Sequence, residues 1–355
     1  MDPRGVLVVD DSGFRPDGSL PATPPGLEHV ANRPIVHHVL DVLASAGVEE
    51  VFVASSSERG AEVRDCLAGR WSRDRVRLRY VEKEGPLDLP GAMSLAARLV
   101  GEAPCVLHVA GGLLGEPLTP FVKHLYSESP DAVMIVHQGP APYGHLGPAT
   151  REMLRLAELD PKRAALGIAG VSLFARGALE HAAACDWWTD RDVDLSVIAD
   201  RIAAVGGSLH VRLVDVWHAY SGKALDLLEL NRIVLDRMES DHRRQDGNGN
   251  RIEGRVQIDA GASVQTSVIV GPAIIGAGAR IADAYIGPYT AIGAGARVEG
   301  AEIERSIISS GASIWHIGCR IAGSVIGQDA RVFRDFSLPR AMRLRVGQGT
   351  EVALS

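Results

Sequence analysis

Lysine is scarce in this 355-residue sequence, where it occurs only as Lys83, Lys123, Lys162 and Lys223. The remaining basic residues are arginines that form no run, and the formal net charge is −7. Proteins that bind nucleic acid neutralise its phosphates with clustered lysine and arginine. We therefore expect no nucleic-acid partner.

Cysteine is equally sparse, and its positions form no motif. Cys66, Cys105, Cys185 and Cys319 lie far apart without a CxxC pair, so we expect neither a zinc site nor a disulfide framework. This usage suits a reducing cytoplasm. The sequence also lacks a signal peptide and any apolar run near 18 residues, and we expect no export and no membrane association.

A repeat of branched aliphatic residues dominates the sequence from residue 252 onward. The spacing is six, six and then five residues, so the pattern recurs every 17 residues. Short strands that each turn one aliphatic side chain into a shared interior explain this period, which predicts a parallel β-helix of hexapeptide type. The repeat weakens after Ile303 but continues to Val332, and residues 333–355 are predicted to cap the last coil. The clearest members are Ile252, Ile258, Val264, Ile269, Ile275, Ile281, Ile286, Ile292 and Val298.

Glycine marks the predicted turns between these strands. Because glycine adopts positive φ without steric cost, we expect such residues where the backbone bends sharply. The positions are Gly271, Gly276, Gly278, Gly287, Gly293 and Gly295.

The first 240 residues predict an α/β domain, because apolar runs alternate with amphipathic segments. Such alternation is typical of a mainly parallel sheet covered by helices, with ligands bound beyond the carboxyl ends of the strands. Residues 241–250 are polar and Gly-rich and are predicted to be a linker to the β-helix domain, residues 251–355. The predicted strands are 6–9, 51–54, 76–81, 105–109, 132–136 and 168–174, and the predicted helices include 35–46 and 91–99.

Three stretches resemble the sugar-1-phosphate nucleotidyltransferases, most closely the long form of glucose-1-phosphate thymidylyltransferase. They are Val-Ala-Asn-Arg-Pro-Ile at 30–35, the segment 222–236, and the repeats at 267–276 and 285–290. The resemblance implies a Rossmann-like nucleotidyltransferase domain of GT-A-like type, followed by a left-handed β-helix. It also implies a reaction in which a sugar phosphate attacks the α-phosphate of a nucleoside triphosphate and releases pyrophosphate.

The phosphate loop of that family has an altered counterpart here. The family sequence Gly-Gly-Ser-Gly-Thr-Arg aligns with residues 10–15, so Ser12, Gly13 and Arg15 remain while Asp10 and Asp11 replace glycines. A carboxylate about 5 Å from a phosphate would repel it by roughly 3 kcal/mol at an effective dielectric near 20. No catalytic residue is assigned, although Arg15 is retained from the loop.

Other positions implied by the resemblance are also changed. The phosphate-binding lysine falls on Pro25, and the two Mg²⁺ aspartates fall on Gly111 and Tyr220. The base-reading glutamine and its neighbouring glycine fall on Lys83 and Asp88. The sequence therefore predicts no metal site and no cofactor.

The sugar-binding positions are better kept. Gly144 and Gly170 match backbone contacts of the family, and Glu158 matches a glutamate that accepts hydrogen bonds from sugar hydroxyls. The lysine expected directly after that glutamate is Leu159, and Lys162 is close enough in sequence to substitute for it.

These observations predict a non-catalytic relative that retains a pocket for a sugar phosphate or nucleotide sugar and serves as a scaffold or regulator. Such a protein would form homo-oligomers or assemble with an active homologue. One alternative is an active pyrophosphorylase for an unusual sugar or cyclitol phosphate, with Mg²⁺ held by Asp10, Asp11, Asp88 or Asp215. Another is acyl transfer at the β-helix with His316 as base, whereas His37 and His38 are interpreted as packing or surface residues.

Overall fold

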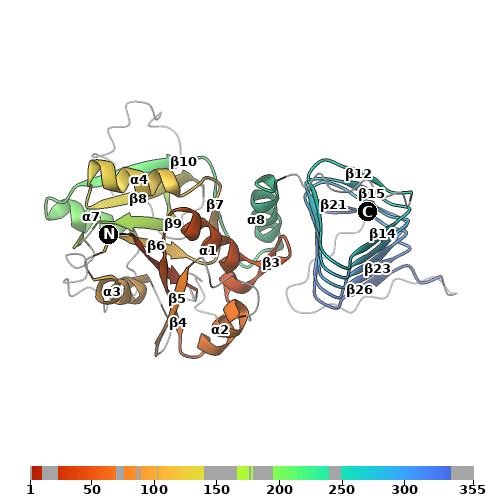
Figure 1. Cartoon of the computed structure of the whole chain (residues 1–355), viewed down its shortest axis with the longest axis horizontal. Helices are drawn as coiled ribbons and strands as arrows, with labels where there is room; N and C mark the ends of the chain where they lie inside the picture. Colours follow the sequence, from red (N-terminus) through yellow and green to blue (C-terminus); the bar gives the residue numbers. More distant parts are fainter. Residues whose placement is uncertain are drawn as a thin grey trace.

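The structure is a computed structural model of the chain. It describes residues 2–9, 23–68, 76–84, 87, 89–101, 103–139, 166–175, 177–178, 195–239 and 249–336, with side chains left out at 89–94, 195, 196 and 198. Figure 1 shows a helix-covered sheet beside a stack of coils, with the helix α8 (Ala224–Asp236) between them.

A seven-stranded sheet forms the centre of the first part, in the order β10-β8-β9-β6-β1-β4-β5. Every neighbouring pair is parallel except the two pairs made by β9, which confirms the predicted mainly parallel sheet. The central strands are apolar along their length because helices cover the sheet. The strands are β1 (Arg4–Val8), β4 (Glu50–Ser56), β5 (Arg77–Lys83), β6 (Cys105–Val109), β8 (Ala132–Gln138), β9 (Leu166–Phe174) and β10 (Leu209–Val214).

Helices pack against this sheet through apolar stripes. In α1 (Ile35–Ser45) the buried residues recur at helical spacing, and the helix begins directly after Pro34. This confirms the predicted helix to within one residue. In the part of the chain that the structure describes, no helix has the length and apolar character needed to cross a membrane. The other helices are α2 (Gly60–Ala68), α3 (Leu89–Val100), α4 (Thr119–Glu128), α7 (Leu195–Ala204) and the 3₁₀ turn η2 (Pro25–Leu27).

Two short antiparallel ribbons lie outside the main sheet. One pairs β7 (Gly112–Leu114) with β11 (Trp217–Ala219), and the other pairs β2 (His29–Val30) with β3 (Arg33–Pro34). The β2–β3 turn places Ala31 and Asn32 at φ 45° and 63°, as a tight hairpin turn requires. Unlike the equally short strands of the β-helix, these four strands belong to no repeat, so the sequence did not predict them.

The second part is a left-handed parallel β-helix built from three five-stranded parallel sheets. The register aligns the predicted aliphatic residues in columns, and Ile252, Ile269, Ile286, Ile303 and Ile321 form one of them. The sheets are β12 (Arg251–Glu253), β15 (Val268–Val270), β18 (Tyr285–Ile286), β21 (Glu302–Glu304) and β24 (Ile321–Ala322); β13 (Val256–Ile258), β16 (Ala273–Ile275), β19 (Thr290–Ile292), β22 (Ile307–Ile308) and β25 (Val325–Ile326); and β14 (Ser263–Gln265), β17 (Arg280–Ala282), β20 (Arg297–Glu299), β23 (Ser313–Trp315) and β26 (Arg331–Phe333).

The weakened repeat after Ile303 has a local cause. Ile303 and Ile308 are five residues apart where the earlier coils have six, and Ile314 and Ile321 are seven apart where the earlier coils have five. The columns nevertheless continue, since Ile303 pairs with Ile321 and Ile314 with Val332. The length changes are therefore absorbed at the corners of the coil.

The glycines of the coils have two different roles, which corrects the sequence analysis. Gly278 and Gly295 have positive φ, as predicted for sharp bends. Gly276 and Gly293 do not, and a Cβ on either would lie 2.6 Å or less from a backbone nitrogen of the next coil. Gly271 and Gly287 also lack positive φ and have no room for a Cβ. These four positions need glycine because atoms of an adjacent coil lie too close to leave room for a side chain.

The predicted linker and cap are only partly described. Of residues 241–250, the structure describes Gly249 and Asn250, and of residues 333–355 it describes the part up to Phe336. The domain limits therefore stay predictions.

Candidate functional site

The carboxyl edge of the main sheet is where a ligand of an α/β fold is expected. The Ala110 N–H donates to the Val8 carbonyl at 2.8 Å, and the Val9 N–H donates to the Ala54 carbonyl at 3.0 Å. The central strands therefore end side by side. Residues 10–22 follow directly, and the loop residues Asp10, Asp11, Ser12, Gly13 and Arg15 lie outside the described residues.

The 3₁₀ turn η2 closes against the end of β6. A Cβ on Gly26 would lie 2.6 Å from the Ala110 Cβ, so the two backbones are in close contact. Pro25, at the position of the phosphate-binding lysine, is buried in this turn. A buried proline offers no charge to a phosphate.

The β7–β11 ribbon brings together the two positions implied for the metal carboxylates. The Tyr220 N–H donates to the Gly111 carbonyl at 2.9 Å, so these residues are direct neighbours although they are far apart in sequence. Neither has a carboxylate. The residues present at these two positions do not fit the Mg²⁺ ion that the resemblance implies, because that ion needs carboxylate oxygens.

Asp215, one of the alternative metal ligands, lies at the opposite end of the same ribbon. Its backbone N–H donates to Glu116 Oε1 at 3.0 Å. Asp215 and Tyr220 are five positions apart in the sequence and flank β11, which corresponds to roughly 16 Å of extended chain at about 3.3 Å per residue. Asp215 therefore lies away from the positions of the missing carboxylates, and its role as a metal ligand in the alternative stays a prediction.

His108 of β6 and Trp217 of β11 form a neutral aromatic pair. His108 is buried, and its Nδ1 lies 2.8 Å from the Val109 carbonyl, which can only accept, so Nδ1 carries the proton. Burial lowers the pKa of His108 to about 4, against the smaller opposing effect of this hydrogen bond. The ring lies 5.7 Å from the ring of Trp217. This pair thus contributes no charge at neutral pH.

Of the predicted sugar-binding residues, the structure places Gly170. It lies in β9, buried, one residue beyond the pair of His108 and Val171, and so beside the carboxyl end of β6. Gly144, Glu158 and Lys162 lie outside the described residues, as does Asp88. Lys83 ends the edge strand β5, paired with Ser56 and two strands from β1.

A second region of interest is the junction between the sheet and the β-helix. Asn231 of α8 is fully buried there. Its Oδ1 accepts from the Ala31 N–H at 2.9 Å, and its Nδ2 donates to the Tyr289 carbonyl at 3.0 Å. Asn32 Nδ2 donates to the Ile292 carbonyl at 2.7 Å. One helix and one tight turn therefore hold the third coil.

Comparison with known proteins gives full-length relatives, although no family model matches the chain. Glucose-1-phosphate thymidylyltransferase from Streptomyces griseus is 26% identical over 333 residues, which is 92% of each chain. The protein of the same name from Streptomyces antibioticus is 26% identical over 356 residues, 99% of each chain. The low-salt glycan biosynthesis nucleotidyltransferase Agl11 from Haloferax volcanii is 26% identical over 361 residues, 99% of this chain and 100% of its own.

The chain is thus similar over nearly its whole length to sugar-1-phosphate nucleotidyltransferases. A crystal structure described as a glucose-1-phosphate thymidylyltransferase from Bacillus anthracis, in complex with sucrose, shares the fold with a TM-score of 0.53 at 13% identity. That match covers 65% of this chain and 94% of the other. The predicted resemblance is thereby confirmed.

The stretches that resemble the nucleotidyltransferases meet at the junction. Ala31 and Asn32 belong to the stretch 30–35, Asn231 to 222–236, and Tyr289 to 285–290. Ala31, Leu235 and Ile274 also share one small apolar cluster. Each stretch supports the resemblance by itself, but their contact could not be predicted, because no single stretch shows its partners.

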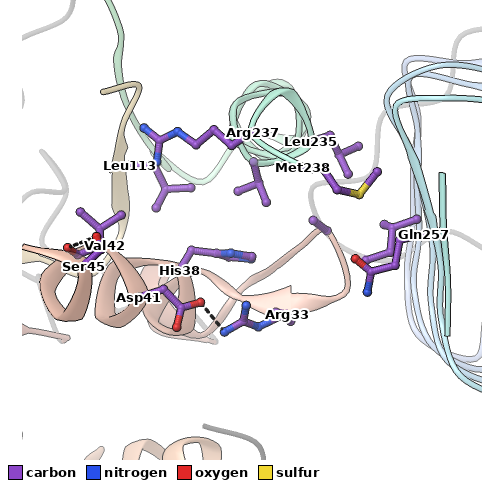
Figure 2. Close-up of a pocket in the computed structure, with 13 residues that line it drawn as sticks. Arg33, His38, Asp41, Val42, Ser45, Leu113, Leu235, Arg237, Met238 and Gln257 are labelled. Carbon is purple, nitrogen blue, oxygen red and sulfur yellow. Dashed lines mark hydrogen bonds and ion pairs between the residues drawn. The ribbon is translucent and has the colours of Figure 1, made fainter. Parts of the chain in front are cut away.

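A cavity of about 380 Å³ lies beside this junction between the sheet and the β-helix (Figure 2). It was not predicted from the sequence. His38 of α1 lines it, so its interpretation as a packing or surface residue is incomplete. His37, one residue earlier, is buried with its Nε2 3.2 Å from the Cys66 carbonyl, as expected for a packing residue. His316 is exposed at a corner of the β-helix.

Proposed function

We propose that this chain is a non-catalytic relative of the sugar-1-phosphate nucleotidyltransferases that binds a sugar phosphate or a nucleotide sugar. The observation that carries the proposal is the contact between Gly111 and Tyr220. These positions meet as two metal-binding positions should, yet they hold a glycine and a tyrosine. The buried Pro25 at the lysine position supports the same conclusion.

The physical argument concerns charge. Transfer of a nucleotidyl group gathers several negative charges on phosphates, which metal ions and basic side chains must neutralise. With Gly111, Tyr220 and Pro25 in place, the three positions implied for these groups supply neither carboxylates nor a cation. Binding of a sugar needs only hydrogen bonds and apolar contact, for which Gly170 remains beside the end of β6.

A pyrophosphate-release assay tests the proposal. The full chain is incubated with Mg²⁺, each common nucleoside triphosphate and a panel of sugar 1-phosphates, and the expected rate equals that without protein. Turnover near the usual enzymatic range of about 1–1,000 s⁻¹ would overturn it. In that event Asp10→Ala and Asp11→Ala variants would show whether these carboxylates hold the metal, as the alternative function requires.

Binding is tested separately by thermal denaturation with sugar phosphates and nucleotide sugars. A ligand that binds the folded chain raises its apparent stability by RT ln(1 + [L]/Kd), so a selective rise in Tm is expected for a member of this panel. No rise for any of them at millimolar concentration would remove the binding part of the proposal.

The proposed biological role is that of a scaffold or regulator that assembles with itself or with an active homologue. The flat sides of the β-helix offer a surface for such contacts, and closed symmetry is common in assemblies of this kind. Sedimentation of the full chain alone, and then mixed with an active relative, should give a complex larger than one chain. A monomer under both conditions would contradict this role.

A further inference from the structure

The cavity at the junction is lined by elements from both parts of the molecule. Its lining includes α1, the turn before β3, β7, α8 and the first two coils, where Gln257 and Ile274 face it. Figure 2 shows the side chains of α8 on one side of this space and those of α1 on the other. A volume of about 380 Å³ falls within the range of small-molecule sites.

One side of the cavity is apolar. Val234, Leu235 and Met238 line it from the end of α8, and Ile274 lines it from the second coil. Leu235 and Ile274 are buried, so this wall is a fixed part of the junction core. Such a surface suits the carbon face of a ring and gives no hydrogen bond.

Two hydrogen-bond acceptors lie apart from the α8 wall, His38 on α1 and Gln257 on the first coil, where Gln257 is paired with Ile274. His38 Nε2 lies 3.1 Å from the Val30 carbonyl, so Nε2 carries the proton and Nδ1 is an acceptor. Burial, aided by the charge of Arg33, lowers the pKa of His38 to about 4 and keeps the ring neutral at pH 7. Gln257 donates from Nε2 to Asp259 Oδ1 at 2.9 Å, which leaves its Oε1 as a second acceptor.

Two arginines, Arg33 and Arg237, also line the cavity. Arg33 Nη2 lies 2.8 Å from Asp41 Oδ2, and the guanidinium carries further N–H donors at Nε and Nη1. Arg237 directs Nη2 to the carbonyls of Leu114 and Glu116 and likewise has further N–H groups. The described lining thus carries two guanidinium groups and one carboxylate, a net charge of +1 with His38 neutral.

We propose that this junction cavity binds a small polyhydroxylated organic anion. Hydroxyl groups would donate to His38 Nδ1 and Gln257 Oε1, the anionic group would accept from Arg33, and the ring carbons would lie against Val234 and Met238. Sugar phosphates and sugar acids share this chemistry. The site uses other residues than the carboxyl edge of the sheet, so the inference stands independently of the proposed function.

A ligand in this cavity would contact α1, α8 and the first two coils at once. It would therefore bind only when the two parts are docked, and it would stabilise their docking by mass action. The docking of the β-helix onto the sheet domain would therefore become more stable as the ligand concentration rises.

The test is calorimetric titration of the full chain with glucose 1-phosphate, glucuronate, glucose and inorganic phosphate as separate probes. We expect glucose 1-phosphate or glucuronate to bind at least ten-fold more tightly than either glucose or phosphate alone. Equal affinity for phosphate and glucose 1-phosphate, or no binding of any probe, would overturn the proposal.

Variants then locate the binding site. Gln257→Ala changes an exposed residue of the first coil and should weaken binding about 3- to 10-fold, as expected for one lost hydrogen bond. Met238→Trp places a larger side chain in the space and should abolish binding. The matched control is Gln265→Ala, an exposed glutamine of the same coil that does not line the cavity.

If probes bind equally well to the wild type and to both cavity variants, they bind elsewhere and the junction proposal fails. That result would leave the proposed sugar pocket at the carboxyl edge intact. Loss of binding in Met238→Trp, with normal thermal unfolding and normal binding by Gln265→Ala, would support the cavity site.

Discussion

Asp226 lies in the first turn of α8 and connects the helix to the strand before it. One carboxylate oxygen lies 3.1 Å from His218 Nε2, and the other accepts from the N–H and the hydroxyl of Ser221 at 2.9 and 2.5 Å. Burial raises the pKa of this carboxyl, but the hydrogen bonds outweigh burial and hold the pKa at about 2, below the ordinary 3.8. The charged form is therefore favoured in the folded chain.

The first prediction concerns acid stability. Because the pKa of Asp226 is lower in the folded than in the unfolded chain, its contribution is present above about pH 4 and is lost as pH falls toward 2. Asp226→Asn should therefore lower the free energy of unfolding at pH 7, and its difference from the wild type should shrink between pH 4 and 2. Urea unfolding across this range measures the effect.

The control for this experiment is Glu239→Gln, which removes an exposed carboxylate beyond the end of α8. It accounts for the change in overall charge. A difference between wild type and Asp226→Asn that stays constant from pH 7 to pH 2 would show that the hydrogen bonds at Asp226 do not favour its charged form.

At the scale of elements, the coils of the β-helix depend on two kinds of glycine. Gly276 has no room for a Cβ, which would lie 2.6 Å from the Ala294 nitrogen. Gly278, two residues later, has φ +69° and no atom within 4 Å of such a Cβ. The first position is limited by the neighbouring coil and the second by backbone conformation alone.

The second prediction follows from this difference. Gly278→Ala should cost about 1–2 kcal/mol, the usual strain of a non-glycine residue in the left-handed region. Gly276→Ala should cost more than Gly278→Ala, because backbone of the adjacent coil must move to admit the methyl group. Chemical denaturation of the two variants, followed by circular dichroism, compares them directly. Equal destabilisation would contradict the role of close coil contact.

A third prediction concerns the columns of branched residues. Ile292 is fully buried in a central coil, whereas Val332 in the last described strand is only partly buried. Ile292→Ala should cost about 2–5 kcal/mol in the free energy of unfolding. Val332→Ala should cost less, because each coil is stabilised mainly by its direct neighbours. The same denaturation measurements test this, and a larger cost at Val332 would contradict it.

At the scale of the whole molecule, α8 and the β2–β3 turn join the sheet to the coils. Asn231 contacts both sides through its side-chain amide, and Tyr289 donates from its hydroxyl to Asp236 Oδ1 at 3.0 Å. The amide of Asn231 is buried, so each of its lost hydrogen bonds would leave a backbone group without its partner.

The fourth prediction is that Asn231→Ala loosens this junction. We expect a loss of about 2–4 kcal/mol and a broader or divided transition in scanning calorimetry, because the two cores would no longer unfold together. Leu225→Ala is the matched control on the same helix, since Leu225 is 73% exposed. A variant that unfolds in one sharp transition at the wild-type temperature would contradict this account of the junction.

The sequence predicted much of the fold and less of the site. Six strands of the sheet and the columns of the β-helix were predicted because they depend on periodicity, a property of nearby residues. The short ribbons β2–β3 and β7–β11 were not predicted, although the second brings Gly111 to Tyr220. The cavity beside His38 and Gln257 was not predicted, because its lining comes from six segments of the chain.

The sequence by itself determined the class of each part and the identity of the residues at the implied catalytic positions. Local spacing fixes which side chains face inward, and the absence of a carboxylate at position 111 or 220 does not depend on folding. Only the tertiary structure decided which distant residues meet, such as Asn231 with Ala31 and Tyr289, and where a cavity remains. Contacts of this kind depend on the docking of whole elements, and no local pattern in the chain encodes that geometry.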